Sequence, residues 1–299
     1  MKVTITGASG FVGQNLLLYL KDKQWEVNAL SLREVSWSEN FPQEGDAIIH
    51  LAGKAHDTSN TSSTNAYFEI NRDLTIELFK CFLKSDIRDF IFFSSVKAVA
   101  DSVVDELSEN IDPNPQTAYG KSKHEAEQYL LKQVLPGHKR LFIIRPCMIH
   151  GPGNKGNLNL LYNVVKKGLP WPLASFNNHR SFLSIDNLSF LIEAMLLKKD
   201  LESGIYNFSD DDTLSTNELV SLIGQTLGKK EKLWNISPSL IRLIVKLGDV
   251  LPLPLNSERL KKLTESYVVS NSKIKIKLEI IKLPISAKEG LIKTFRSFS

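Results

Sequence analysis

The amino-acid sequence predicts an α/β fold, in which a doubly wound parallel sheet is followed by a smaller, mixed α/β domain. Two observations predict this class. From residue 2 to about Pro146, short apolar runs alternate with segments whose apolar residues recur every three or four positions. After Pro146 the alternation stops, and glycine, proline and asparagine gather between Cys147 and Gly156. We therefore expect one domain at residues 1–150 and a second at residues 151–299, with some interleaving of the chain.

Short runs rich in β-branched and aromatic residues predict the buried strands Lys2–Thr6, Glu26–Leu30, Ala47–Leu51, Phe90–Phe93 and Leu141–Ile144. Helical periodicity predicts helices between them at Phe11–Leu20, Tyr67–Leu83 and Tyr119–Gln133. Strands that alternate with helices pair in parallel, because each helix returns the chain to the same end of the sheet. The second half offers shorter elements at Ser181–Asp186 and Gly204–Ser209, followed by a helical, lysine-rich final third.

The composition excludes several classes of protein. With 37 Lys and Arg against 33 Asp and Glu, the formal net charge of +4 over 299 residues is too mild to indicate nucleic-acid binding. The 2 cysteines, Cys81 and Cys147, lie far apart and belong to no Cys/His pattern. We therefore expect neither a metal site nor a disulfide scaffold.

The apolar stretches predict neither export nor membrane insertion. The first residues, MKVTITGASGFVG, are broken by glycines, unlike a signal peptide. Arg242, Lys246 and Asp249 interrupt the stretch Leu240–Leu255, so we expect no membrane span. This stretch is either a packed helix of the second domain, which we favour, or an amphipathic helix that touches a membrane. We expect a cytoplasmic protein.

Three glycines, Gly7, Gly10 and Gly13, stand in GASGFVG between the first predicted strand and the first predicted helix. Here one glycine permits a tight turn, one lets a pyrophosphate approach the backbone, and one lets the helix pack closely on the strand. The N-terminus of the helix attracts phosphates through its free N–H groups and its dipole. We therefore predict a Rossmann-type dinucleotide site that also includes Ser9, Phe11 and Val12.

The residues after the second strand bear on the choice of dinucleotide. A carboxylate at this point would hold the ribose 2′-hydroxyl of NAD, but Ser31 and Arg33 come first and Glu34 follows out of register. A hydroxyl and a guanidinium suit a 2′-phosphate, which a carboxylate would repel. We therefore favour NADP(H) as the cofactor, with NAD as the alternative.

A tyrosine and a lysine follow four positions apart, Tyr119 and Lys123, at the start of a predicted helix. Residues i and i+4 share a helix face, so both side chains can point into one site. We expect the ammonium to lower the pKa of the phenol, which can then exchange a proton with an alcohol or ketone. Ser95 ends a predicted strand and can hydrogen-bond the same substrate oxygen.

The glycine loop, the strand-end serines and the Tyr–Lys pair, in this order, resemble the extended short-chain dehydrogenases/reductases. Within them the chain resembles the NAD-dependent epimerase/dehydratase family, which acts on nucleotide sugars. The resemblance spans essentially the whole chain, through HLAGKA (50–55), EINRDLT (69–75), FFSS (92–95) and RPCMIHGPGN (145–154). It implies further cofactor contacts by Leu51, Ala52, Gly53, Asn71, Ser94 and Pro146.

The resemblance also implies the contacts to substrate. Arg180 of RSFLSIDNL stands where the family holds the diphosphate, and Arg259 where related enzymes often place a second phosphate-binding arginine. Met148 occupies the position of a nucleotide-sugar-binding asparagine, a role that Asn157 or Asn159 would take over. Lys97 is either a contact to a substrate phosphate or a solvated loop residue.

Two departures from the family pattern narrow the activity. Val96 and Lys97 stand where the 4,6-dehydratases carry an acidic pair, which argues against elimination. The stretch from Arg33 to Asp46 is short for the family's usual third strand and helix, so we expect an open adenine pocket.

The sequences of these motifs are similar to those of bacterial enzymes of surface-polysaccharide precursor synthesis. We favour an NADP(H)-dependent reductase of the C4 carbonyl of a UDP-4-keto-6-deoxy sugar. Tyr119 would donate the proton, Ser95 would polarise the oxygen and Lys123 would hold the nicotinamide ribose. The alternative is an NAD-dependent UDP-sugar 4-epimerase, acting on UDP-glucose or UDP-GlcNAc with the same residues. A non-catalytic NADP-sensing regulator is a remote third reading. A UDP-sugar is the expected partner, and the homodimer common in the family is a further expectation.

Overall fold

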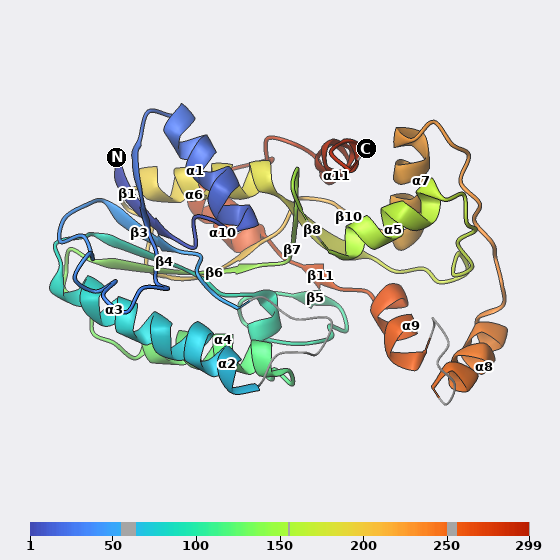
Figure 1. The fold of residues 1–299 in the computed structure, drawn as a ribbon, viewed down its shortest axis with the longest axis horizontal. Coiled ribbons are helices and arrows are strands. Elements are labelled where there is room, and N and C mark those ends of the chain that lie inside the picture. The colour runs from blue at the N-terminus through green and yellow to red at the C-terminus, as the bar shows by residue number, and fades with distance from the viewer. Residues whose placement is uncertain (55–63, 155, 250–255, 299) are drawn as a thin grey trace.

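A six-stranded parallel sheet forms the centre of the computed structural model, which describes residues 1–54, 64–154, 156–249 and 256–298. The order of the strands across the sheet is β2-β1-β3-β4-β6-β9 (Figure 1). Their bounds are β1 (Lys2–Thr6), β2 (Glu26–Leu30), β3 (Ala47–His50), β4 (Asp89–Phe93), β6 (Arg140–Pro146) and β9 (Gly204–Phe208). The predicted strands of the first half are therefore all present and parallel.

Helices cover both faces of this sheet, as predicted (Figure 1). On one face lie α1 (Phe11–Asp22) and α6 (Ile185–Leu197), which bury Leu16 and Leu191 against the strands. On the other face lie α3 (Leu74–Lys84) and α4 (Ala118–Leu131), which bury Phe79 and Leu130. The predicted helix 67–83 is a continuous helical segment built from α2 (Thr64–Phe68), a π-helical turn (Glu69–Asp73) and α3. Burial of these apolar faces on the sheet stabilises the doubly wound arrangement.

The chain between β2 and β3 forms turns and no strand, which leaves β2 at the edge of the sheet. The side chains of Trp37 and Phe41 from this segment are buried in the same core as Ile48 and Phe79. Two aromatic side chains of this segment therefore pack on the sheet. The segment forms no additional strand or helix, as its short length predicted.

The second half of the chain contributes to both parts of the molecule. Its strand β9 pairs with β6, and α6 packs on α1, so the first sheet includes residues beyond 150. A second sheet, β10-β8-β7, is made of β7 (Met148–His150), β8 (Arg180–Ser184) and β10 (Thr213–Leu214). Around it lie α5 (Asn157–Lys166), α7 (Thr216–Thr226) and α11 (Ala287–Arg296), which share a second apolar core. The two cores are joined by chain that crosses between them more than once.

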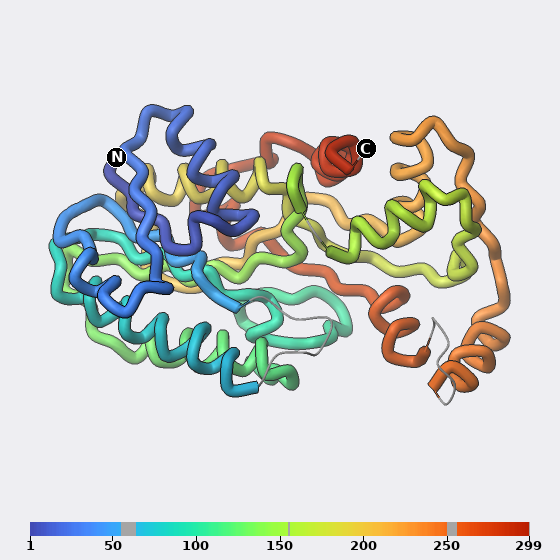
Figure 2. Tube along the Cα trace, in the orientation of Figure 1, coloured from blue at the N-terminus to red at the C-terminus, as the bar shows by residue number. Residues whose placement is uncertain are grey.

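The C-terminal third runs to the far end of the molecule and returns (Figure 2). It forms α8 (Pro238–Gly248), α9 (Ser257–Thr264), β11 (Val268–Val269) and α10 (Ser272–Leu278) before α11. Strand β11 pairs with the short β5 (Glu106–Leu107), which follows a 3-10 turn at Val96–Ala98. The predicted stretch 240–255 is helical to residue 248, and residues 250–255 lie outside the described part of the chain, as does residue 55 of HLAGKA.

No helix in the described ranges is long and apolar enough to cross a membrane.

Candidate active site

The carboxyl ends of the parallel strands bring the predicted cofactor residues to one edge of the sheet. Thr6 of β1 is in register with Leu30 of β2 on one side and with His50 of β3 on the other. The residues that follow these strands, Gly7, Ser31 and Leu51, are therefore neighbours at the same edge. Ser94 and Cys147 follow β4 and β6 there in the same way.

The glycine loop has no room for side chains at two of its three glycines. Gly7 has a φ of +69°, and a Cβ built on it would lie 2.6 Å from the backbone nitrogen of Ala52. A Cβ on Gly13 would lie 2.3 Å from the carbonyl oxygen of Gly7. At Gly10 the corresponding contact is a milder 3.3 Å. Close packing of strand, turn and helix thus explains Gly7 and Gly13, while Gly10 leaves an open backbone.

The N-terminus of α1 is open to an anion. Its N-cap, Gly10, offers no side chain, and the first turn carries no acidic residue. Ser9 and Gly10 are exposed, and Phe11 and Val12 are half-buried. The residues fit the pyrophosphate of a dinucleotide, because unpaired N–H groups and the helix dipole both attract negative charge.

The residues after β2 lie beside this loop. Ser31 and Arg33 are exposed, and so is Glu34. The pairing of β1 with β2 places Ser31 next to Gly7, so a hydroxyl, not a carboxylate, occupies the first position after the strand. Both residues predicted to bind the 2′-phosphate are exposed, one and three positions after the end of β2.

Buried hydrogen bonds set the shape of the loop after β3. The amide of Asn71, in the π-helical turn, accepts from the Lys54 N–H at 2.8 Å and donates to the Lys54 carbonyl at 3.1 Å and to Ser122 Oγ at 3.1 Å. A Cβ on Gly53 would lie 3.0 Å from Asn71 Oδ1 and 3.2 Å from Lys123 Nζ. The side chains of Asn71 and Lys123 therefore leave no room for a side chain at position 53, and the hydrogen bonds of Asn71 to Lys54 shape the loop after β3.

His50 is a structural residue. Its two ring nitrogens are hydrogen-bonded to the hydroxyls of Thr6 at 2.7 Å and Thr75 at 2.9 Å. Burial, with the nearby Lys123 charge, lowers the pKa of His50 to about 3, so the imidazole is neutral. The histidine links β1, β3 and α3 below the cofactor edge.

The predicted catalytic residues come together. The hydroxyl of Ser95 is hydrogen-bonded to the phenol of Tyr119, and it also accepts from the Lys97 N–H at 3.2 Å. The ring of Tyr67 meets that of Tyr119 edge-on, with centroids 6.2 Å apart. Ser95, after the end of β4, and Tyr119, in the first turn of α4, thus lie side by side.

One electrostatic expectation is wrong. Burial raises the pKa of Tyr119, a change that the Ser95 hydrogen bond only partly offsets. Lys123 does not act on the phenol; its ammonium donates to the Phe93 carbonyl at 2.8 Å, and burial lowers its own pKa to about 8. The i, i+4 spacing brings both residues to one face, but the long lysine side chain turns toward the end of β4.

A buried ion pair supports this arrangement and was not predicted. Arg145 of β6 donates through Nε and Nη2 to both carboxylate oxygens of Glu127 of α4, the shortest contact being 2.5 Å. Ser94 donates its hydroxyl proton to the same carboxylate, so that proton is already used. Pro146, predicted to meet the cofactor, is buried directly after this arginine. The sequence holds two signals of this ion pair. Glu127 follows Lys123 by four positions, and Arg145 follows an apolar run.

Two predicted substrate residues lie together beyond the catalytic pair. Lys97 donates to the Asp101 carbonyl at 2.8 Å and stands 4.2 Å from the centre of the Tyr267 ring. Arg180 donates to the Lys262 carbonyl at 2.7 Å. Burial lowers the pKa of each cation, and each is influenced by charges nearby, Arg180 among those acting on Lys97. The two half-buried cations therefore lie near each other, and the backbone N–H of Lys97 is hydrogen-bonded to Ser95.

The other predicted substrate residues are more dispersed. Arg259 is exposed on α9, one turn before Lys262. Met148 packs against the second core, and Asn157 is exposed at the start of α5. Asn159 accepts from the Gly156 N–H at 3.0 Å and lines a hollow of about 290 Å³ with Tyr162 and Phe298.

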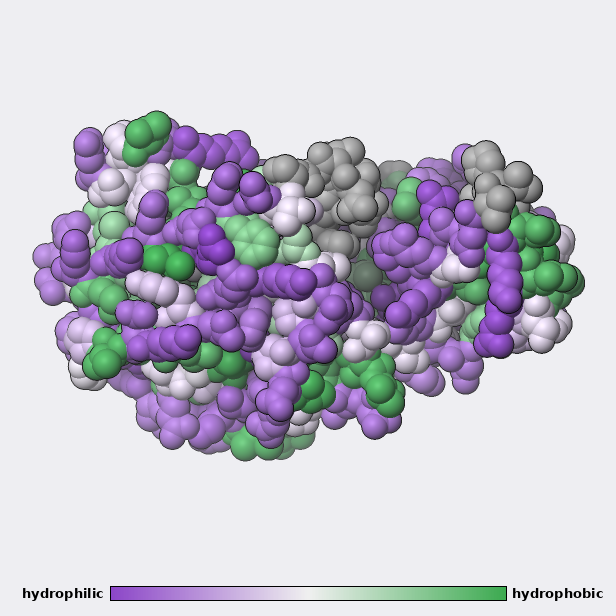
Figure 3. Space-filling model, turned by 90° about the horizontal axis from the view of Figure 1, so that it is seen from below, coloured by the Kyte–Doolittle hydropathy of each residue, from purple (hydrophilic) through white to green (hydrophobic). Residues whose placement is uncertain are grey.

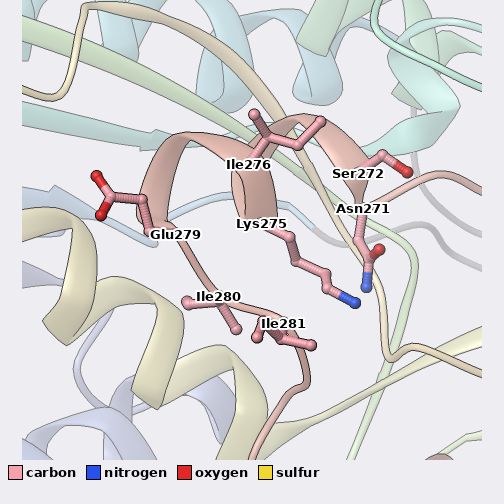
Figure 4. A pocket seen from close by; sticks show the side chains of 7 residues that line it. All are labelled: Asn271, Ser272, Lys275, Ile276, Glu279, Ile280 and Ile281. Carbon is pink, nitrogen blue, oxygen red and sulfur yellow. The ribbon is translucent and has the colours of Figure 1, made fainter.

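A larger hollow lies elsewhere. It has a volume of about 390 Å³ beside α10, and its walls contain none of the predicted site residues (Figure 4). Two of its polar side chains, Asn271 and Lys275, donate to Asp211 at 3.0 and 2.7 Å. These contacts tie α10 to the chain after β9, so we assign the hollow no part in the site. Among the described residues, no group of three or more His, Cys, Asp or Glu side chains is placed to hold a metal ion.

Comparison with known proteins shows which proteins the chain is similar to. A sequence model described as "NAD dependent epimerase/dehydratase family" matches residues 3–208. A UDP-glucose 4-epimerase of Vibrio cholerae is 30% identical over 249 residues, which cover 76% of each chain. An N-acetyl-alpha-D-glucosaminyl-diphospho-ditrans,octacis-undecaprenol 4-epimerase of Escherichia coli O157:H7 is 29% identical over 247 residues, or 76% of this chain and 73% of its own.

Solved structures show the same fold. The structure of RMD from Pseudomonas aeruginosa complexed with NADPH superposes with a TM-score of 0.76 at 20% identity, over 100% of this chain and 99% of the other. The UDP-glucose 4-epimerase of Thermus thermophilus in complex with NAD gives a TM-score of 0.72 at 19% identity, with the same coverage of 100% and 99%.

Proposed function

Because this chain belongs to the NAD-dependent epimerase/dehydratase family, and is thus an NAD(P)-dependent enzyme of sugar nucleotides, we propose that it is an NADP(H)-dependent reductase of a UDP-4-keto-6-deoxy sugar. The observation that carries the choice is the pair Ser31 and Arg33, exposed beside the glycine turn at the end of β2. A guanidinium there attracts a 2′-phosphate, and a reductant that is consumed is commonly NADPH.

The dinucleotide supplies the hydride for the C4 carbonyl. Gly10 and the N-terminus of α1 would bind its pyrophosphate, and Ala52 and Gly53 would contact the rest of the dinucleotide. Lys123, whose ammonium lies near position 53, would donate to the ribose hydroxyls. The lowered pKa of this lysine, about 8, still leaves it mostly protonated at neutral pH.

Tyr119 and Ser95 act on the sugar oxygen. Ser95 donates a hydrogen bond to the carbonyl oxygen, which draws electron density from C4. Tyr119 then gives that oxygen its proton as the alcohol forms. The raised pKa of Tyr119 supports this direction, because the phenol stays protonated at neutral pH and can act as an acid.

The diphosphate of the substrate lies against Lys97 and Arg180. Both side chains are half-buried cations whose pKa burial lowers, so a diphosphate gains more from them than from solvated charges. Val96 and Lys97 stand where elimination would need a general acid and a general base, so neither role is filled there. Reduction and epimerisation at C4 do not need that pair. We further propose a cytoplasmic location.

The alternative is an NAD-dependent 4-epimerase of a UDP-sugar, which would use the same tyrosine, serine and lysine. It is favoured by the epimerases of Vibrio cholerae and Escherichia coli among the relatives. The name of the second of these specifies a sugar diphosphate linked to a polyprenol, so a lipid-linked sugar is the other form that a substrate of this site can take.

One experiment separates the two functions. The purified protein is denatured and the released nucleotide identified, and the native protein is then mixed with NADPH and a UDP-4-keto-6-deoxyhexose. The proposal expects little bound nucleotide and stoichiometric loss of NADPH absorbance with formation of the alcohol. Stoichiometric NAD together with interconversion of UDP-GlcNAc and UDP-GalNAc would replace the reductase by the epimerase.

Two variants test the residues. Tyr119→Phe abolishes turnover in either enzyme and leaves cofactor affinity within about threefold, since the phenol acts on the substrate oxygen. Arg33→Ala weakens NADPH binding about 10- to 100-fold, as expected for the loss of a charge-assisted hydrogen bond, and leaves NADH binding unchanged. Arg242→Ala, at an exposed arginine on α8, is the matched control. If Arg33→Ala bound NADPH as tightly as the wild-type protein does, the argument for NADP(H) would fail.

A further inference from the structure

Helix α8 exposes a continuous apolar stripe. Leu240, Leu243, Ile244 and Leu247 are 49%, 61%, 42% and 56% exposed. Their spacing of i, i+3, i+4 and i+7 puts all four on one face of the helix. Such a face on a soluble surface marks a place where something else is bound.

The stripe is separate from the face by which α8 is held. Ile241 and Val245 are 3% and 2% exposed and pack in the second core with Leu260 of α9. The helix is therefore anchored to the protein on one side, and the four leucine and isoleucine side chains point away from that core. The favoured interpretation of this stretch, a packed helix of the second domain, is confirmed for residues 238–248, and the alternative, an amphipathic helix that touches a membrane, stays a prediction.

Basic residues flank the stripe on one side of the helix. Arg242 and Lys246 stand four positions apart on α8, and both are exposed. Residues 228–248 carry five cations, Lys229, Lys230, Lys232, Arg242 and Lys246, against the single carboxylate of Glu231. This segment alone has a net charge of +4, which equals the formal net charge of the whole chain. Figure 3 shows hydrophobic side chains gathered at the end of the molecule that carries α8, with hydrophilic ones beside them.

An aromatic side chain completes the pattern. Trp234, in the segment leading to α8, is 53% exposed. Leucine and isoleucine along one side of a helix, with lysine and arginine beside them, are typical of helices that lie in the interface of a bilayer, a region where tryptophan is also favoured. At 11 residues, α8 is too short to cross one.

We propose that α8 docks this protein on the surface of a membrane rich in anionic lipid. The stripe enters the boundary between headgroups and acyl chains, and Arg242 and Lys246 on the same helix contact the anionic headgroups. Charge complementarity selects this occupant over a second copy of the chain, because a twofold contact through α8 would bring the cations of two copies together. The proposal is independent of the reaction catalysed.

The docking surface is joined to the substrate side of the molecule. Helix α8 packs on α9, and the Lys262 carbonyl of α9 accepts from Arg180. A protein bound through α8 therefore holds its predicted diphosphate site close to the membrane surface.

Vesicle sedimentation tests the proposal with the full chain. Vesicles of phosphatidylcholine with 30% phosphatidylglycerol, as the anionic lipid, are compared with pure phosphatidylcholine vesicles. We expect binding to the anionic vesicles that is at least tenfold stronger and falls as salt is raised. The double variant L243E/L247E loses at least 30-fold in partitioning, and R242Q/K246Q loses about 10- to 30-fold, near 1 kcal/mol per charge.

The control is L18E/I281E, which makes the same change of charge at two exposed apolar residues away from α8. It keeps its partitioning within about threefold. Thermal unfolding of each variant verifies that it is folded, which exposed positions allow. The proposal fails if the wild-type chain does not sediment with anionic vesicles, or if the control loses as much as L243E/L247E. It also fails if the chain is a dimer that L243E/L247E converts to a monomer while neither binds vesicles, since a second copy then covers α8.

Discussion

Replacement of Glu127 by glutamine tests how much the buried ion pair beneath the active site contributes. Glu127 and Arg145 are 1% and 2% exposed, and the guanidinium makes three contacts of 2.5 to 3.2 Å to the carboxylate. The third guanidinium nitrogen, Nη1, is already buried without a partner. The variant leaves the arginine charge in place without its counter-ion, and an amide N–H₂ facing its donors.

The expected cost follows from burial. Removing one partner of a buried pair costs about 3–5 kcal/mol, because the remaining charge is neither solvated nor paired. With an unfolding entropy of about 2.1 cal/mol/K per residue, this lowers the melting temperature by roughly 5 to 8 °C for a chain of 299 residues. The Ser94 hydroxyl also loses a charged acceptor, which adds to the loss.

The control removes both charges. In Glu127→Leu/Arg145→Met no charge is left unpaired, so we expect a stability within about 2 kcal/mol of the wild type. Calorimetry on this double variant and on its two single variants, Glu127→Leu and Arg145→Met, completes a double-mutant cycle. If Glu127→Gln melts within about 1 °C of the wild type, or if the double variant loses as much as the single variants together, the pair is not the buried, coupled unit described above.

Three further predictions concern the cofactor edge. Gly13→Ala forces a Cβ to within 2.3 Å of a carbonyl oxygen, so it lowers the free energy of unfolding by about 1–3 kcal/mol and weakens dinucleotide binding. The control is Gly137→Ala, whose Cβ meets nothing within 4 Å and which changes neither quantity. Urea titration measures the stability, and fluorescence measures the binding. Lys123 has a pKa of about 8 in the fold and 10.5 when unfolded, so the unfolded chain binds more protons between these values and stability rises with pH by up to about 3 kcal/mol. Urea unfolding between pH 7.5 and 10.5 shows this rise, and Lys123→Met loses it; an identical pH dependence in the variant contradicts the assignment. Trp37→Ala lowers stability by about 3–5 kcal/mol, measured in the same way, because Trp37 covers a sheet face that would otherwise be bare, and a loss below 1 kcal/mol would show that the segment after β2 is dispensable.

Local pattern was sufficient for the first half of the fold. Strands Lys2–Thr6 and Glu26–Leu30 have the predicted bounds, because short apolar runs closed by turns leave few alternatives. Asn71 was found through a resemblance, but its π-helical turn was not, since a single inserted residue in a helical turn leaves no trace in apolar periodicity. The membership of Gly204–Phe208 in the first sheet likewise depends on a pairing with β6 far along the chain.

The sequence by itself determined the glycine turn, the Tyr119–Lys123 spacing and the serine at the end of β4, because each depends on residues a few positions apart on one element. The tertiary structure alone decided the electrostatics. The direction of the Tyr119 pKa depends on burial and on where the Lys123 ammonium points, and the Glu127–Arg145 pair joins a helix to a strand 18 positions away. Burial and long-range partners are properties of the packed molecule. The pKa shifts and the ion pair therefore depend on packing, whereas the local motifs depend on residues that are close in the sequence.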